Sequence, residues 1–254
     1  MRPDPGGSHA RPRTVGGGNS HPDTVVRSGM TTWGFIGSGN IGSTVARLAV
    51  DAGHQVVMSN SRGPQTLTDL VTGLGTHASA ATAAEAAAAG DVVVVTVPLR
   101  HYRDIPAANL AGGLVIDTMN YYPDRDGHFA ELDDGSTTSS ELLQAHLPTT
   151  RVVKAFNNIF FQHLAALPRL AGATDRSALP IAGDDDAAKA IVVGLLNEIG
   201  YDAVDLGVLA EGWRSQPGTP AYGTPYAADP TDWTAGARPA GIAELRRLAA
   251  AATR

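Results

Sequence analysis

The 254-residue sequence has no cysteine, few aromatic residues and no long apolar run. Without cysteine the chain can form no disulfide, no thiolate nucleophile and no cysteine-ligated metal site. No apolar stretch reaches the roughly 18 residues that cross a bilayer, and the N-terminus lacks the apolar core of a signal peptide. The net charge of −6 comes without a dense lysine and arginine stripe, which argues against nucleic-acid binding. We therefore expect a cytoplasmic protein, most simply an enzyme, that contacts neither nucleic acid nor membrane.

Residues 1–29 mix glycine, proline, serine, arginine and histidine in no periodic order. Such a segment buries too little apolar surface to offset the entropy of ordering, so we expect it to be disordered. Met30 stands immediately before the first expected strand and could be the natural start. A functional N-terminal arm is the alternative.

From Thr31 onward, strand-like and helix-like patterns alternate. Repeated βα units of this length predict an α/β fold with a doubly wound, mostly parallel Rossmann sheet and a smaller C-terminal α/β extension. A polar loop is expected at 120–136 and an aperiodic tail at 211–240. The expected strands are 32–36, 54–59, 77–79, 91–97, 113–117, 151–156, 179–183 and 203–205. One expected helix begins at Asn40, four more cover 64–74, 81–89, 138–147 and 240–252, and another follows the strand that ends at 183.

A glycine-rich turn follows the first expected strand, with the sequence Gly37-Ser38-Gly39-Asn40-Ile41-Gly42. In a Gly-x-Gly-x-x-Gly turn, the first glycine permits the tight bend and the second lets a pyrophosphate approach the backbone. The third allows close packing of the helix on the strand. The free amides and positive dipole end of the helix then face the phosphates. The pattern alone is weak, but its place between a strand and a helix favours a dinucleotide site.

The residues after the second expected strand indicate which dinucleotide binds. An NAD site commonly has Asp or Glu about 20 residues beyond the glycines, where it accepts a bond from the ribose 2′-hydroxyl. This chain has Asn60, Ser61 and Arg62 there instead. Because a guanidinium fork suits a phosphate, the sequence favours NADP(H). The alternative is a plain polar loop.

Three consecutive aspartates, 184–186, precede the helix that follows the strand 179–183. Consecutive carboxylates point in different directions, which is unfavourable for a shared metal ion. Carboxylates are instead favoured at the positive end of a helix. We expect helix capping here and no metal site.

Several motifs together resemble the family of NADPH-dependent oxidoreductases for coenzyme F420, a deazaflavin electron carrier. They cover roughly residues 32–209 in the family's order, and the glycine turn alone would fit any Rossmann protein. The matching stretches are 37–42, Ser61-Arg62, Val97-Pro98-Leu99-Arg100-His101, Val152-Val153-Lys154-Ala155-Phe156-Asn157-Asn158-Ile159 and 183–186.

The resemblance implies a role for particular residues. Ser38, Asn40 and Ile41 would surround the pyrophosphate, and Ser61 with Arg62 the 2′-phosphate. Residues near the nicotinamide would be Val97, Pro98, His101, Met119 and Asn120. The acceptor would lie on Asn157, Asn158, Ile159, Phe160 and Phe161. Residues 30–156 would then form the NADP-binding domain and 157–254 the portion for the substrate or second cofactor. A homodimer is also expected.

The chain departs from the family pattern in two places, the bulky pair Phe160-Phe161 and the segment 213–223 with the tail after it. The acceptor therefore stays open between coenzyme F420 and the imine or carbonyl of a small molecule. A redox sensor that binds NADP(H) without turnover is a third interpretation. Trp213 and Tyr222 could close over a substrate or pack between subunits.

Hydride exchange between two ring systems needs little side-chain chemistry, because the cofactors carry the reaction. A carbonyl or imine acceptor would need an acid. His101 is the candidate to test first, although helix capping or a ribose contact explains it as well. Asp117, Tyr121 and Tyr122 are further candidates because they lie at or just after the end of an expected strand.

Overall fold

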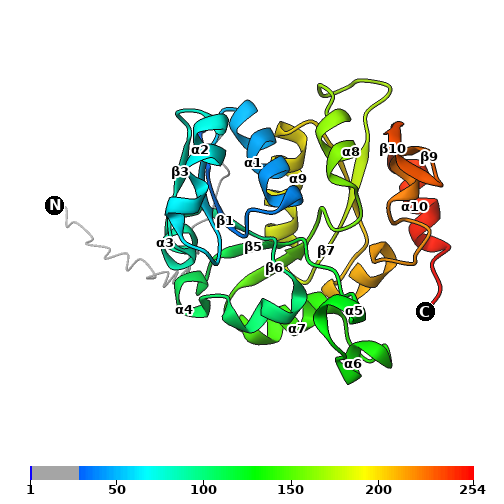
Figure 1. The fold of residues 1–254 in the computed structure, drawn as a ribbon, viewed down its shortest axis with the longest axis horizontal. Helices are drawn as coiled ribbons and strands as arrows, with labels where there is room; N and C mark the ends of the chain where they lie inside the picture. Colours follow the sequence, from blue (N-terminus) through cyan, green and yellow to red (C-terminus); the bar gives the residue numbers. More distant parts are fainter. Residues whose placement is uncertain (2–28) are drawn as a thin grey trace.

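The sheet at the centre of the molecule has eight strands in the order β3-β2-β1-β4-β5-β6-β7-β8 (Figure 1). This computed structural model describes Met1 and residues 29–254, so the expectation of disorder for residues 1–29 lies outside it. The strands are β1 (Thr32–Ile36), β2 (Gln55–Ser59), β3 (Ala78–Ala80), β4 (Val92–Val95), β5 (Leu114–Asp117), β6 (Arg151–Lys154), β7 (Ala178–Gly183) and β8 (Asp202–Asp205).

The strand order confirms the expected fold class. Strands β3 to β6 pair in parallel, in the 3-2-1-4-5-6 order of a doubly wound dinucleotide-binding sheet. Strand β7 is antiparallel to β6 and parallel to β8, and this pair forms the C-terminal extension of the same sheet. The strand order reverses between β1 and β4, and ligands bind at such switch points.

Helices cover both faces of the sheet. Apolar side chains of α1, α2, α8, α9 and α10 pack on one face, and those of α3, α4 and α7 on the other. The helices are α1 (Asn40–Asp51), α2 (Thr68–Leu74), α3 (Ala83–Ala89), α4 (Ala107–Leu110), α5 (Pro123–Asp126), α6 (Ala130–Asp133), α7 (Ser139–His146), α8 (Phe161–Ala166), α9 (Asp186–Glu198) and α10 (Ile242–Ala250), and the 3₁₀ turns are η1 (Pro64–Leu67), η2 (Leu99–Asp104), η3 (Leu209–Ser215) and η4 (Thr224–Tyr226).

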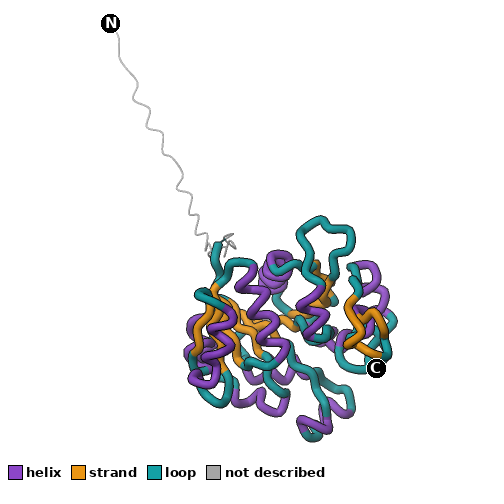
Figure 2. Tube along the Cα trace, turned by 45° about the horizontal axis from the view of Figure 1, so that its top comes forward, coloured by secondary structure: helices purple, strands orange, loops and turns teal. Residues whose placement is uncertain are grey.

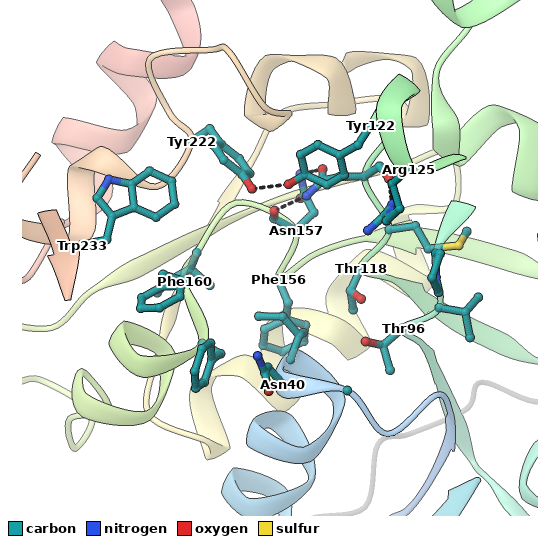
Figure 3. A pocket seen from close by; sticks show the side chains of 18 residues that line it. Asn40, Thr96, Thr118, Tyr122, Arg125, Phe156, Asn157, Phe160, Tyr222 and Trp233 are labelled. Carbon is teal, nitrogen blue, oxygen red and sulfur yellow. Dashed lines mark hydrogen bonds between the residues drawn. The ribbon is translucent and has the colours of Figure 1, made fainter. Parts of the chain in front are cut away.

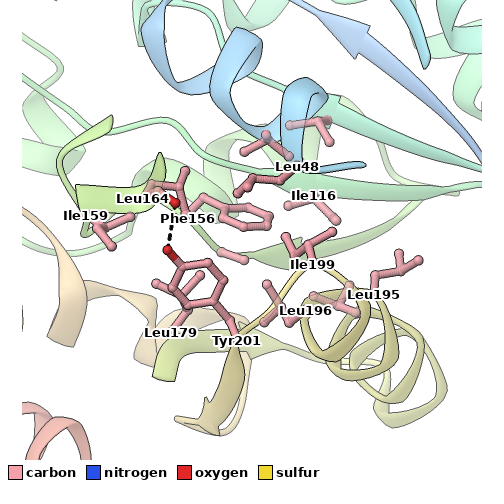
Figure 4. Close-up of a cluster of buried hydrophobic side chains, with 14 of the residues drawn as sticks. Leu48, Ile116, Phe156, Ile159, Leu164, Leu179, Leu195, Leu196, Ile199 and Tyr201 are labelled. Carbon is pink, nitrogen blue, oxygen red and sulfur yellow. Dashed lines mark hydrogen bonds between the residues drawn. The ribbon is translucent and has the colours of Figure 1, made fainter. Parts of the chain in front are cut away.

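The larger part of the core lies between the sheet and α1, α8 and α9 (Figure 4). Leu48 of α1 and Leu196 of α9 pack there with Ile116 of β5. Burial of each such side chain contributes about 1.5–3 kcal/mol. Tyr201 is fully buried, and its hydroxyl donates to the carbonyl oxygen of Leu164 over 2.7 Å. That bond satisfies the one polar group that this ring brings into the core.

The strand expected at 151–156 ends at Lys154. Phe156 is the one non-glycine residue in the described part of the chain with a positive φ, 62°. This conformation is unfavourable for a bulky residue and breaks the extended pattern. The chain therefore turns at the carboxyl end of β6 and does not continue the strand.

The loop and the tail contain structure that periodicity did not reveal. The loop 120–136 includes α5 and α6, four residues each, too short to show a helical repeat. The tail 211–240 includes η3, η4 and an antiparallel hairpin of β9 (Ala227–Asp229) and β10 (Asp232–Ala237). Figure 2 shows this hairpin at the end of the molecule that carries the C-terminus. Other element ends differ from the expected ones by a few residues.

None of the helices in the described range 29–254 has the length and apolar character needed to span a membrane.

Candidate functional site: two adjoining cavities at the switch point

The glycine turn between β1 and α1 has the geometry that its sequence predicts. Gly37 has a φ of +110°, and a Cβ there would lie 2.3 Å from the carbonyl oxygen of Thr96. A Cβ on Gly42 would lie 2.6 Å from the Thr96 methyl group. Around Gly39, by contrast, no described atom would lie within 4 Å of an added Cβ. The first and third glycines are thus required by packing, whereas the second faces open space.

The N-terminus of α1 is open to an anion. Gly39 is the N-cap residue, no side chain caps the helix, and its first turn has no acidic residue. The helix has 12 residues, so its amide dipoles add over three turns. Free first-turn amides next to open space fit a phosphate group.

A groove of about 510 Å³ extends from this turn toward the end of β2. We call it the Arg62 groove. Arg62 is exposed, its backbone amide donates to Asn60 Oδ1 over 2.9 Å, and its guanidinium has no hydrogen-bond partner in the described part of the chain. An exposed guanidinium without a protein partner fits the 2′-phosphate of NADP. The groove is lined by residues 36–39, 59–62 and 96–98 together with Ala83, His101, Asp104 and Ile105.

His101 lies in the Arg62 groove, on η2, and does not line the second cavity. Its Nδ1 is 3.0 Å from Asp104 Oδ2, and its Nε2 accepts from Arg100 Nε over 3.2 Å. Both ring nitrogens therefore have protein partners. This placement favours a ribose contact or a structural role over the nicotinamide-side role that the resemblance implies.

A second cavity of about 370 Å³ has the lining residues Gly39, Thr96, Val97 and Pro98 in common with the Arg62 groove, so the two cavities adjoin there. We call it the aromatic chamber (Figure 3). It lies at the carboxyl ends of β4, β5 and β6, where an open α/β sheet binds ligands. Its other lining residues are Asn40, Ile41, Thr118, Met119, Asn120, Tyr122, Arg125, Phe156, Asn157, Ile159, Phe160, Phe161, Tyr222 and Trp233.

The two asparagines after β6 have different positions. Asn157 lines the chamber, and its Nδ2 donates to Asn120 Oδ1 over 3.2 Å and to the Ser215 carbonyl over 2.9 Å. Asn158 is fully buried behind the wall, and its Nδ2 donates to the carbonyl of Ala221 over 2.9 Å. Its own carbonyl accepts from Gly223. Asn158 thus fastens the tail to the sheet and has no surface in the chamber.

The tail supplies two chamber residues, Tyr222 and Trp233, with ring centroids 5.8 Å apart. Sequence reasoning named Tyr222 but not Trp233, which is on the hairpin. Trp213, the other tail residue named, lies outside the chamber. It is buried and packs against the guanidinium groups of Arg214 and Arg254 at 4.5 and 5.2 Å from its ring centroid.

The aspartates 184–186 have separate partners. Asp185 Oδ1 caps α9 by accepting from the amide of Ala188 over 2.8 Å, as the sequence predicts. Asp184 accepts from the amide of Leu209, and Asp186 pairs with Lys189. In the part of the chain that the structure describes, no three His, Cys, Asp or Glu side chains gather as a metal site would require.

Comparison with known proteins agrees with this geometry. The model of a family described as NADP oxidoreductase, coenzyme F420-dependent, matches residues 32–121. A hypothetical protein from Sinorhizobium meliloti, SMa0349, is similar in structure with a TM-score of 0.66 and 32% identity, over 74% of this chain and 91% of that one. The chain belongs to the family of F420-dependent NADP oxidoreductases.

A second solved structure has a function in its description. A candidate F420-dependent NADP reductase from Arthrobacter sp. FB24 is 28% identical with a TM-score of 0.60, over 71% of this chain and 86% of that one. The protein YjhV of Escherichia coli strain K12 is 45% identical over 51 residues, a match that spans 37% of its length.

The family model ends at Tyr121. It therefore includes the glycine turn, Arg62 and the loop after β5. Asn157, Tyr222 and Trp233, which also line the chamber, lie beyond it. The family match thus includes the residues expected to hold the nucleotide, and it includes none of the chamber residues that follow β6.

Proposed function

We propose that the protein transfers a hydride between NADPH and a planar aromatic acceptor, and that this acceptor is coenzyme F420. The observation that carries the proposal is that the two cavities adjoin at Gly39, Thr96, Val97 and Pro98, which line both. One cavity ends at an unpartnered guanidinium and the other has aromatic walls. A dinucleotide that spans both would present its nicotinamide to a ring in the chamber.

The residues present fit NADP(H). The first-turn amides of α1 would hold the pyrophosphate beside Ser38, Asn40 and Ile41, and Ser61 with Arg62 would hold the 2′-phosphate. NADPH supplies the hydride chemistry. The chain's part is to hold the nicotinamide against Val97, Pro98, Met119 and Asn120 at the carboxyl ends of β4 and β5, and to exclude water there.

The aromatic chamber fits a flat acceptor. Ile159, Phe160 and Phe161 form one wall, and Trp233 lies 6.2 Å from Phe160 between ring centroids. Aromatic rings bind other rings by stacked or edge contacts at such separations. The Arthrobacter protein, described as an F420-dependent reductase, supports a deazaflavin in this place. The proposal divides the chain into a nucleotide part, 30–156, and an acceptor part, 157–254.

Steady-state oxidation of NADPH tests the acceptor. The purified protein is assayed with F420, with free flavins and with a set of cyclic imines and carbonyls. Turnover with F420 is expected. Turnover with imines or carbonyls alone would replace the deazaflavin, and tight NADPH binding without any turnover would favour a redox sensor. A cytoplasmic location and a homodimer stay predictions, which fractionation and light scattering check.

A further inference from the structure

The hydroxyl groups of Tyr122 and Tyr222 meet at one side of the aromatic chamber, 2.5 Å apart (Figure 3). Tyr122 follows β5 and Tyr222 comes from the tail, 100 residues later. Two phenol oxygens at this distance share a short hydrogen bond. The contact joins the two parts of the chain at the cavity.

One of the two hydroxyl protons of this pair is not used in the hydrogen bond between them. Two hydroxyl groups carry two protons, but a single bond between them uses only one. Neither hydroxyl has another hydrogen-bond partner within residues 29–254. The hydroxyl that accepts the shared bond therefore has a free O–H, and a ligand in the chamber is the group that can receive it. Chains of hydrogen bonds strengthen one another, so the shared bond makes this O–H a better donor.

A guanidinium group lies close to the pair. The Arg125 guanidinium lies over the Tyr122 ring, 4.7 Å from its centroid, and is held by an ion pair with the buried carboxylate of Asp126. Burial, and then the bond from Tyr122, raise the pKa of Tyr222, while the charge of Arg125 opposes them. The hydroxyl is consequently protonated at neutral pH, and a phenolate formed after proton release would have a positive charge beside it.

We propose that Tyr122 and Tyr222 together are the proton donor to the hydride acceptor. This inference rests on the proposed function. When the hydride adds to a ring carbon of a deazaflavin, the electron pair of that π-bond moves to the conjugated ring nitrogen. That nitrogen takes the proton, the phenol O–H bond breaks, and water returns a proton to the phenolate. The sum is NADPH, acceptor and one proton giving NADP⁺ and the reduced acceptor.

Two acceptors of similar shape separate proton transfer from hydride transfer. F420 gains a hydride and a proton, whereas the planar N-methylacridinium cation gains only a hydride. For Tyr122→Phe and Tyr222→Phe, kcat with F420 is expected to fall about 100-fold. With N-methylacridinium, corrected for its uncatalysed rate, both variants should stay within about twofold of the unmodified protein, and the double variant should be no slower with F420 than either single one.

Tyr121→Phe is the matched control. The sequence made Tyr121 a candidate acid, but its hydroxyl donates to Asp133 outside the chamber and the residue does not line the chamber, which removes it from that role. This variant should leave both rates unchanged.

A second readout needs no turnover. The absorption band of F420 bound to the NADP⁺-loaded protein should shift when Tyr222 is replaced by Phe, since a donor to the ring is lost.

The outcomes separate the two proposals. Turnover of F420 that Tyr222→Phe leaves unchanged, with no spectral shift, overturns the proton-donor role alone. Equal losses with F420 and N-methylacridinium would also overturn it, because the tyrosines would then only shape the chamber. A protein that binds NADPH but reduces neither acceptor overturns the proposed function, and the donor role with it.

Discussion

The ammonium of Lys154 lies 3.3 Å from the carboxylate of Asp117, and both side chains are buried. The two groups also hold one residue between them. Asp117 Oδ1 accepts from the amide of Met119 over 2.8 Å, and Lys154 Nζ donates to the carbonyl of Met119 over 2.8 Å. The lysine of the motif Lys-Ala-Phe-Asn thus positions the loop after β5, which carries Thr118 and Asn120 into the chamber.

Replacing Lys154 by methionine should lower the free energy of unfolding by about 3–5 kcal/mol, because it leaves the Asp117 carboxylate buried without its cation. Urea unfolding measures the change. The control is Asp175→Asn, which breaks an exposed pair with Arg169 and should cost less than about 1 kcal/mol. Equal losses of unfolding free energy in the two variants would mean that the buried pair contributes no more to stability than the exposed pair.

Replacing Gly42 should lower stability, whereas replacing Gly39 should weaken NADPH binding. Gly42→Ala places a methyl group against Thr96 and should cost about 1–3 kcal/mol of stability. Gly39→Ala meets no described atom, so it should change stability little. It should weaken NADPH binding about ten- to a hundredfold by obstructing the phosphate. Thermal unfolding and fluorescence titration of both variants check this. Unchanged NADPH affinity in Gly39→Ala would place the pyrophosphate elsewhere.

Gly223 should control the position of Trp233. Its φ is +67°, and a Cβ on it would lie 1.9 Å from the Trp233 ring. Gly223→Ala should therefore move the indole and raise KM for the acceptor while the Kd for NADPH stays unchanged. Gly218→Ala is the control, since Gly218 has a φ of +87° but no described atom within 4 Å of an added Cβ. If both variants raise KM equally, the cause is backbone strain and not the displaced ring.

Lowering the pH should remove the stability that Asp126 contributes to the loop that carries Arg125. Burial raises the pKa of Asp126, but bonds from Arg125 and Tyr122 outweigh it and lower that pKa below its usual value. The stabilisation by Asp126 is then fully present above about pH 4 and is lost as the pH falls through the lower, folded pKa. Urea midpoints from about pH 6 to about pH 3 should fall less steeply in Asp126→Asn than in the unmodified protein. Parallel curves would contradict this.

The sequence predicted the glycine turn and the strands around it well, because these features depend on local signals. The spacing of Gly37, Gly39 and Gly42 between a strand and a helix requires a particular backbone path, and the structure follows it. The β-branched run at 92–95 likewise has few alternatives to a strand buried on both faces.

The aromatic chamber depends on contacts between residues far apart in the chain. Trp233 faces the chamber only because its hairpin packs against Gly223 and Phe160. The resemblance implies an acceptor contact for Asn158, whereas its bonds to the tail, which the sequence does not reveal, give it a structural role. Neither periodicity nor a turn motif encodes such pairings.

Equilibrium titration with NADPH and NADH, on the unmodified protein and on Arg62→Ala, tests the central claim most directly. We expect tighter binding of NADPH than of NADH. Arg62→Ala should lose about 1.5–3 kcal/mol of binding free energy for NADPH, roughly ten- to a hundredfold in Kd, and far less for NADH. No measurable affinity for either nucleotide, or equal losses for both, would contradict the account.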